Sequence, residues 1–166
     1  MTSGIKIGNY KKIIVPDNLS GEARDKFIVG QIMRNSDAQV SESEIRNRAV
    51  GMFEQFDISL SQQGLSIDEY YKRNNTNEKE LMLKFMEHSK RQIKERKVLL
   101  HISEIEEIYA DEEDYNLYIE RISKLYPLST EKISELLTGK EKLRIVEEIT
   151  LRKTIDYISE YYCMSN

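Results

Sequence analysis

The segment VSESEIRNRAVGMFEQFDISLSQQGLSIDEYYKRNN, residues 40–75, decides the fold class of this chain. Apolar residues recur in it at helical spacing for about five turns, which predicts a long amphipathic helix. Gly64 predicts the end of that helix, because glycine adopts the left-handed conformation of a helix cap at low cost. A short helix follows, and each helix opens with a capping box, in which a serine and a glutamate cover each other's backbone N–H groups. The boxes are Ser41 with Glu44 and Ser66 with Glu69, and the apolar positions of the long helix are Ile45, Ala49, Met52, Phe53, Phe56 and Leu60.

Helix signals also dominate outside this segment. With only 7 Gly and 2 Pro in the chain, few residues interrupt helix formation. Residues 5–15 are the exception, because β-branched residues alternate there and Gly8-Asn9 offers a hairpin turn. The sequence therefore predicts an all-α, elongated multi-helix fold with arm-like long helices and one short N-terminal strand or hairpin. The predicted helices span residues 21–35, 42–63, 67–73, 77–109 and 111–126, a short stretch from Ser129 or Thr130 to Gly139, and residues 140–162.

Two of the predicted helices carry further information. Pro127 predicts a break after the helix whose inward face includes Leu125 and Tyr126. In the helix of residues 77–109, the apolar stripe shifts phase near Val98. This shift indicates that the two halves of the helix pack on different neighbours.

Length and composition limit the class of protein. At 166 residues, we expect an extension over residues 1–19 and one helical domain over residues 20–166. The net charge of −4 argues against a nucleic-acid partner, because such domains are usually basic. No apolar run is long enough for a membrane span or a signal peptide. The single cysteine, Cys163, is predicted to be a frayed and unreactive thiol, and a cytoplasmic location is expected.

Few residues are suited to catalysis or metal binding. His88 and His101 are too far apart on one predicted helix to share an ion, which requires a spacing of three or four residues. Thr138-Gly139-Lys140 resembles the end of a phosphate-binding loop, but the upstream glycine and strand are missing, so we predict a helix end at Gly139. Residues 111–114 are acidic, and capping of a helix start explains them. We therefore predict no catalytic residue, no metal site and no cofactor.

Two clusters leave a binding role open. The basic charges of residues 90–97 wrap around a helix, which favours a solvated face over contact with a ribosome, a nucleic acid or an acidic peptide. Methionine and aromatic residues gather between residues 52 and 86. Thioethers adapt to differently shaped partners, so an exposed binding surface is one interpretation and core filling is the other. The candidate substrate-binding residues are Met52, Phe53, Phe56, Tyr70, Tyr71, Met82, Phe85 and Met86.

The order of these elements resembles the C-terminal domain of bacterial trigger factor, the ribosome-associated chaperone. The long helix, hinge and short helix of residues 40–75 carry the first part of this resemblance. Residues 75–126 are similar to the long arm helix of the family, its acidic joint and the helix that follows. Residues 143–162, LRIVEEITLRKTIDYISEYY, resemble its last helix, so the matching order covers roughly residues 23–162. Ser41 stands where the family often has proline, and serine is a good N-cap.

The resemblance implies an ATP-independent chaperone module that binds exposed apolar segments of unfolded or nascent polypeptides. Trigger factor holds unfolded chains in a helical cradle lined with scattered apolar residues, which favours the binding interpretation of the candidate residues. We expect no prolyl isomerase, because an FKBP-type domain needs on the order of a hundred residues of mainly strand. Only a short stretch separates Val15 from the first helix. The ribosome-docking motif of the family, a Gly-Phe-Arg loop followed by Gly-Lys-Pro, is not in the sequence, which gives no support for ribosome contact.

A second function also agrees with the sequence. The same helices would bury their apolar stripes in a homodimer or against a fixed partner, and the chain would then be a non-catalytic adaptor or structural module. Long helices with a phase-shifted stripe support this alternative as well as the first. A natural short form and a domain-deleted form of a longer protein both remain compatible with the sequence.

Overall fold

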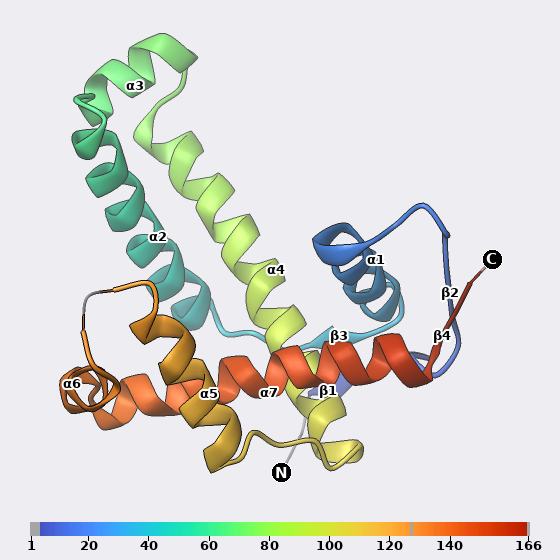
Figure 1. The fold of residues 1–166 in the computed structure, drawn as a ribbon. Coiled ribbons are helices and arrows are strands. Elements are labelled where there is room, and N and C mark those ends of the chain that lie inside the picture. The colour runs from blue at the N-terminus through green and yellow to red at the C-terminus, as the bar shows by residue number, and fades with distance from the viewer. Residues whose placement is uncertain (1–3, 127, 166) are drawn as a thin grey trace. The chain divides into compact units, whose positions relative to one another are not determined.

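The computed structural model describes residues 4–126 and 128–165 and is mainly helical (Figure 1). Seven helices form most of the described chain, and its strands are only two or three residues long. The predicted all-α class is therefore confirmed, whereas the predicted break at Pro127 lies outside the described residues. The helices are α1 (Gly21–Met33), α2 (Glu42–Gln62), α3 (Ile67–Asn74), α4 (Glu78–Ile105), α5 (Glu112–Ser123), α6 (Thr130–Leu136) and α7 (Gly139–Tyr161).

The starts of α2, α3 and α4 follow the sequence signals. The Ser41 hydroxyl accepts a hydrogen bond from the Glu44 N–H at 3.2 Å, and the Glu44 carboxylate accepts one from the Ser41 N–H at 2.9 Å. The second predicted capping box forms the same reciprocal pair at the start of α3. Asn77 caps α4, since its side-chain oxygen accepts from the Glu80 N–H at 3.0 Å. Gly64, with φ of 73°, adopts the predicted left-handed conformation after α2.

Helix α4 ends earlier than predicted. It stops at Ile105 instead of near Tyr109, because Glu107 adopts the left-handed conformation with φ of 54°. The Ile108 N–H then donates to the carbonyl oxygen of Ser103 at 2.8 Å, which is the closing bond of a Schellman motif. Glycine usually occupies the left-handed position of this motif, so a glutamate there gives no sequence signal for the helix end.

Gly139 begins a helix, so the predicted helix end at this position is wrong. Thr138 is the N-cap of α7, and its hydroxyl accepts from the Glu141 N–H at 3.3 Å. The Glu141 carboxylate accepts from the Thr138 N–H at 2.7 Å, which completes a capping box. Helix α6 has already ended at Leu136. The Thr-x-x-Glu spacing is a start signal that outweighs the glycine next to it.

Helix α5 is shorter than predicted as well. It ends at Ser123, and Leu125 and Tyr126 beyond it are 74% and 59% exposed. The predicted inward orientation of these two side chains is therefore wrong, because residues beyond the helix no longer follow its apolar face. Ile119, one turn before the end of α5, is buried as the helical pattern predicts.

Residues 5–15 form two short strands that pair with other parts of the chain. Strand β1 (Ile5–Lys6) pairs with β3 (Asp37–Ala38), and β2 (Ile13–Val15) pairs with β4 (Cys163–Ser165). The β2–β4 pair is parallel, with Ile13 opposite Cys163, so the hairpin alternative does not form. Cys163 lies in a strand, contrary to the prediction of a frayed end. Burial raises the pKa of its thiol, which lowers the thiolate fraction near neutral pH.

Gly8 makes a close backbone contact instead of a hairpin turn. A Cβ at this position would lie 2.6 Å from the Cβ of Asn35, so only glycine fits without a shift. Its N–H donates to the Ser36 hydroxyl at 2.8 Å, and that hydroxyl donates to the carbonyl oxygen of Ile32 at 2.7 Å. These bonds anchor the N-terminal segment to the end of α1.

The described chain divides into two compact units. Unit 1 comprises Met1–Asp37 and Lys97–Asn166, and unit 2 comprises Ala38–Arg96. The boundary in α4 falls beside Val98, where the apolar stripe of the sequence shifts phase. The division of the chain between residues 19 and 20 stays a prediction.

Unit 1 encloses a core of large aliphatic side chains. Within it, α7 contacts α1, α5 and β4, and α1 also contacts β2. Short strands and helices from both ends of the sequence therefore share one core. Its buried hydrophobic residues are Tyr10, Ile13, Val15, Ile28, Ile32, Val98, Leu99, Ile102, Ile119, Ile133 and Ile158.

A buried carboxylate links three segments of unit 1. The Glu106 side chain is only 9% exposed and accepts hydrogen bonds from the hydroxyls of Tyr10 and Tyr162, the latter at 2.8 Å. Lys11 completes the set with an ion pair to Glu106 at 2.8 Å. The Tyr10 and Tyr162 rings also meet edge to face, with centroids 5.8 Å apart. This cluster joins the N-terminal segment to the residues that follow α4 and α7.

Candidate functional site

A groove in unit 2 is the strongest candidate for a binding site. It lies among α2, α3 and α4, which form consecutive segments of the chain (Figure 1), and its volume is about 600 Å³. Most of its floor is apolar, whereas its charged residues all come from α4. The lining residues are Met52, Phe56, Tyr70, Leu81, Lys84, Phe85, Glu87, His88 and Arg91.

Aromatic rings connect the three helices around the groove. Phe56 of α2 is central, with its ring centroid 4.8 Å from Tyr70 of α3 and 5.7 Å from Phe85 of α4. The rings of Phe53 and Phe85 and those of Tyr70 and Tyr71 extend this network, each at 6.3 Å. All of these pairs meet edge to face, an arrangement that contributes about 0.5–1.5 kcal/mol per pair beyond area burial. The rings thus hold unit 2 together while they remain only half-buried.

Met52 has an unusual polar neighbour. The hydroxyl of Ser89, a fully buried residue on α4, lies 3.3 Å from the Met52 sulfur and donates to it. A thioether is a weak acceptor, so this contact orients Met52 without fixing it firmly. The side chain is half-buried and lines the groove, where its three rotatable bonds allow it to adapt to different shapes.

The charged edge of the groove follows one face of α4. Lys84, Glu87, His88 and Arg91 recur at helical spacing, which places them next to one another along the helix. Arg91 lies 2.9 Å from the ring nitrogen Nδ1 of His88, a hydrogen bond that the neutral ring accepts. Among the residues that the structure describes, Lys84, Glu87 and Arg91 make no ion pair. Their charges are therefore available to a ligand.

Carboxylates surround the opposite end of the aromatic network. Burial raises the pKa of the Tyr71 hydroxyl, and the negative charges of Glu78, Asp68 and Asp57 add to this increase. The phenol therefore stays protonated at neutral pH and remains a hydrogen-bond donor. Charge is thus unevenly distributed in unit 2, with acidic groups near Tyr71 and cations on the α4 edge of the groove.

Half of the candidate substrate-binding residues predicted from the sequence line the groove. Met52, Phe56, Tyr70 and Phe85 line it, and Phe53 and Tyr71 reach it through ring contacts. Met82 and Met86 are half-buried on α4 and lie outside the lining. Whether any of these residues binds a substrate stays a prediction.

Apart from Phe85, sequence reasoning missed the contribution of α4 to the groove, namely Leu81, Lys84, Glu87, His88 and Arg91. The signal was present, because Leu81, Phe85 and His88 are spaced as one helical face. The prediction instead included Met82 and Met86, because methionine adapts to differently shaped partners, and these two residues lie on the neighbouring face of α4. Leu81 is 6% exposed and Leu83 is 52% exposed, so the buried face of α4 is centred one residue before Met82.

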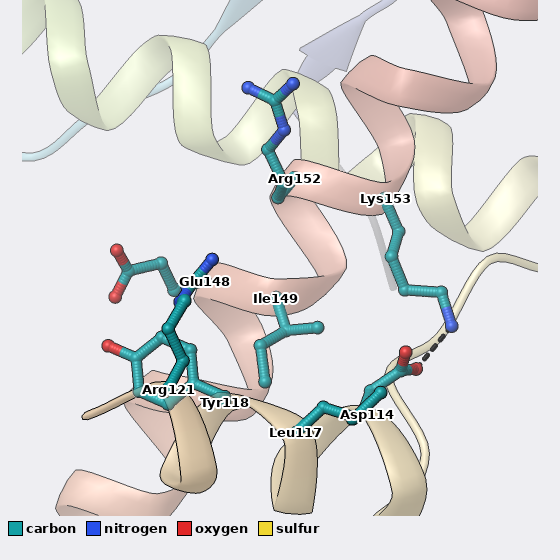
Figure 2. A pocket seen from close by; sticks show the side chains of 8 residues that line it. All are labelled: Asp114, Leu117, Tyr118, Arg121, Glu148, Ile149, Arg152 and Lys153. Carbon is teal, nitrogen blue, oxygen red and sulfur yellow. Dashed lines mark hydrogen bonds and ion pairs between the residues drawn. The ribbon is translucent and has the colours of Figure 1, made fainter. Parts of the chain in front are cut away.

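A second pocket lies between α5 and α7 in unit 1 (Figure 2), with a volume of about 620 Å³. Figure 2 shows Leu117 and Ile149 in its middle and the Lys153–Asp114 ion pair at one side. Its other cations are also occupied, because Arg152 pairs with Asp25 and Asp156, and Arg121 lies over the ring of Tyr118 at 5.4 Å. The complete lining is Asp114, Leu117, Tyr118, Arg121, Glu148, Ile149, Arg152 and Lys153. This pocket has less apolar, adaptable surface than the groove of unit 2.

Metal and membrane sites are not visible in the described part of the chain. Across residues 4–126 and 128–165, no three His, Cys, Asp or Glu side chains gather in a geometry suited to a metal ion. None of the described helices is long and apolar enough to cross a membrane.

The fold is mainly helical, and unit 2 contains a partly exposed, largely apolar groove. A family model described as the C-terminus of bacterial trigger factor protein matches residues 18–160. The chain belongs to this family, which confirms the resemblance seen in the sequence.

Individual relatives agree with this assignment. Trigger factor of Alkaliphilus metalliredigens is 29% identical over 133 residues, a match that covers 80% of this chain and 31% of the relative. Trigger factor of Clostridium beijerinckii is 29% identical over 157 residues, covering 92% of this chain and 36% of the relative. This chain thus spans about a third of the length of the curated relatives it matches. A structure of trigger factor domains from Thermotoga maritima has the same fold, with a TM-score of 0.65, 12% identity and 93% of each chain covered.

Proposed function

We propose that this chain is an ATP-independent chaperone module that binds exposed apolar segments of non-native polypeptides in the groove of unit 2. Membership of the trigger factor family supports a chaperone-type function. The observation that carries the proposal is the groove itself, where Met52, Phe56, Tyr70 and Phe85 present half-buried, adaptable surface. These side chains are large enough to cover an aliphatic or aromatic residue of a client.

Binding in this groove needs no chemical step. Burying one large apolar side chain of a client stabilises the complex by about 1.5–3 kcal/mol, before the entropic cost of ordering the segment. The resulting complexes are weak and reversible. They compete with aggregation by mass action, because a client segment that is bound in the groove cannot contact another client. Methionine and aromatic rings accept differently shaped side chains, so sequence selectivity at the floor of the groove is low.

Light scattering of an aggregating, chemically unfolded client tests the proposal directly. We expect the chain to suppress aggregation at a several-fold molar excess and to sediment with the unfolded client but not with the native one. Failure of both at that excess would contradict the proposal.

A substitution then locates the site. Phe56→Ala removes the ring that links Tyr70 to Phe85, and we expect binding of the client to weaken by roughly 5–30-fold, equivalent to about 1–2 kcal/mol. Tyr109→Ala is the matched control, because Tyr109 is an aromatic residue of unit 1 that is 59% exposed. Circular dichroism establishes that both variants fold. Equal loss in both variants would place the binding surface elsewhere.

The same sedimentation experiment distinguishes the chaperone proposal from the adaptor alternative. A tight homodimer that fails to bind the unfolded client, while Phe56→Ala dissociates the dimer, would favour a structural module whose apolar surface is permanently covered. Acceleration of a proline-limited refolding reaction would contradict the expectation that the chain lacks prolyl isomerase activity.

A further inference from the structure

We propose that the groove of unit 2 prefers client segments in which carboxylates flank the apolar residue, and that Lys84 and Arg91 bind these carboxylates. This inference rests on the proposed function and names the class of segment that the groove takes. The aromatic floor accepts any large apolar side chain, so contacts with flanking carboxylates would be a second determinant of binding. The charges at the edge of the groove then distinguish one apolar segment from another.

The charge of the groove is opposite in sign to that of the chain. The whole chain has a net charge of −4. The groove lining has two cations, Lys84 and Arg91, against one anion, Glu87, which gives 2 − 1 = +1 with His88 neutral. A local positive site on an acidic protein attracts an anionic segment to that site in preference to the rest of the surface.

The two cations are free to receive a ligand. As described above, neither makes an ion pair within residues 4–126 and 128–165, and both side chains are exposed. The hydrogen bond from Arg91 to Nδ1 of His88 uses only part of the guanidinium, which has five N–H donors. It orients the guanidinium and leaves other N–H groups for a carboxylate, which it is shaped to bind in a bidentate manner.

The spacing along α4 sets the spacing in the client. Lys84 and Arg91 are two helical turns apart on one face, or roughly 10 Å at about 1.5 Å per residue. In an extended client, the side chains on one face recur at every second residue, or about every 6.6 Å at about 3.3 Å per residue. Two carboxylates four positions apart therefore lie on one face, roughly 13 Å from each other, with an apolar side chain between them over the floor. The long, flexible side chains of Lys84 and Arg91 can span this separation. Glu87 lies between the cations, so a carboxylate in the middle of the segment is disfavoured.

Three peptides with one fluorescent label test this preference by anisotropy. Their cores are Asp-Ala-Phe-Ala-Asp, Asn-Ala-Phe-Ala-Asn and Lys-Ala-Phe-Ala-Lys, so they share the same apolar centre and differ in flanking charge. In low salt, we expect the acidic peptide to bind roughly 3–10-fold more tightly than the neutral one, which corresponds to about 1 kcal/mol at an exposed site. The preference should shrink to less than about 2-fold near 0.5 M salt, because ions screen exposed charges. Equal affinities in low salt, or tightest binding of the lysine peptide, would overturn the inference.

Charge reversal on α4 assigns the effect to the two cations. The double variant Lys84→Glu, Arg91→Glu replaces both cations of the groove with anions, so it is expected to invert the order of the acidic and lysine peptides. Lys79→Glu, Lys90→Glu is the matched control, since it makes the same charge change at exposed positions of α4 outside the groove. Inversion by the control as well would overturn the inference. Absence of binding by the neutral peptide to the unaltered chain would instead contradict the proposed function itself.

Discussion

The two units use their apolar residues differently. In unit 1, the largest fully buried side chains are aliphatic, among them Ile28, Ile102 and Ile158. In unit 2, the fully buried residues are small, namely Ala49 and Ser89, whereas the phenylalanines and Met52 are only half-buried. Unit 1 therefore has a core of fully buried aliphatic side chains. Unit 2 buries Ile45, Leu60 and Leu81 less completely and leaves its phenylalanines and Met52 half-buried.

The residue types match these two uses. Isoleucine and valine are branched at Cβ and have few rotamers, so they pack into a defined core at little further cost in entropy. Methionine, with three rotatable bonds, and the aromatic residues provide contact area that adapts to a changing partner. A surface of this kind is stable in water only if the rest of the chain supplies the folding free energy.

The largest expected effect tests the stability of unit 1. Ile158→Ala removes a fully buried side chain from α7 and should lower the free energy of unfolding by about 2–5 kcal/mol, through lost burial and the cavity left behind. Ile58→Ala is the matched control, because Ile58 of α2 is 50% exposed and its loss should cost less than about 1 kcal/mol. Urea unfolding followed by circular dichroism measures both. Similar losses in the two variants would remove the contrast between the units.

A smaller effect is expected at the buried carboxylate of unit 1. Glu106→Gln keeps the shape of the side chain but turns one acceptor into a donor that faces tyrosine hydroxyls or Lys11. Because hydrogen bonds to a charged group contribute about 1.5–3 kcal/mol and some would survive, we expect a loss of about 1–3 kcal/mol at pH 7. Glu104→Gln is the control, since that side chain is 57% exposed.

The pH dependence sharpens this test. Burial by itself would raise the pKa of Glu106, but hydrogen bonds from Lys11, Tyr10 and Tyr162 outweigh burial and lower it below its ordinary value. A carboxylate whose pKa falls on folding stabilises the fold above its unfolded pKa of about 4.3. That stability is lost as pH decreases through the lower pKa of the folded state. The difference in the free energy of unfolding between Glu106→Gln and the unaltered chain should therefore become smaller below pH 4. A difference that does not change with pH would contradict this account.

Local signals made much of the helical framework predictable. The capping boxes at Ser41 and Ser66 and the left-handed Gly64 use residues within three positions of each other, so the sequence contains all the partners. Part of the groove lining was predictable for a similar reason, because Met52 and Phe56 lie on the same face of one helix.

The remainder depends on partners that are distant in the sequence. The parallel pairing of Ile13 with Cys163 has no local signal, since neither segment specifies its partner. The end of α4 uses Glu107 in a conformation that usually requires glycine, which only tertiary contacts can select. Arg91 belongs to the basic run of residues 90–97, whereas nothing in the sequence singled out Lys84, and the proximity of both cations to Tyr70 and Phe56 follows from helix packing.

The smallest expected effect compares two serines on α4. Ser89 in unit 2 is fully buried, and its hydroxyl donates to the Met52 sulfur, whereas Ser103 in unit 1 is 3% exposed and donates to the carbonyl oxygen of Leu100 at 2.7 Å. Replacing either serine with alanine should stabilise α4 by about 0.5 kcal/mol, because alanine has the higher helix propensity.

Ser89→Ala relieves the desolvation of a hydroxyl that has only a weak acceptor, so the free energy of unfolding should rise by up to about 1 kcal/mol. Ser103→Ala also loses a good hydrogen bond, worth about 0.5–1.5 kcal/mol, so it should be neutral or slightly destabilising. Urea midpoints measured in parallel give the difference. If Ser89→Ala is the more destabilising substitution, the contact with Met52 is a firm part of the interior of unit 2, and the groove is more rigid than its half-buried side chains indicate.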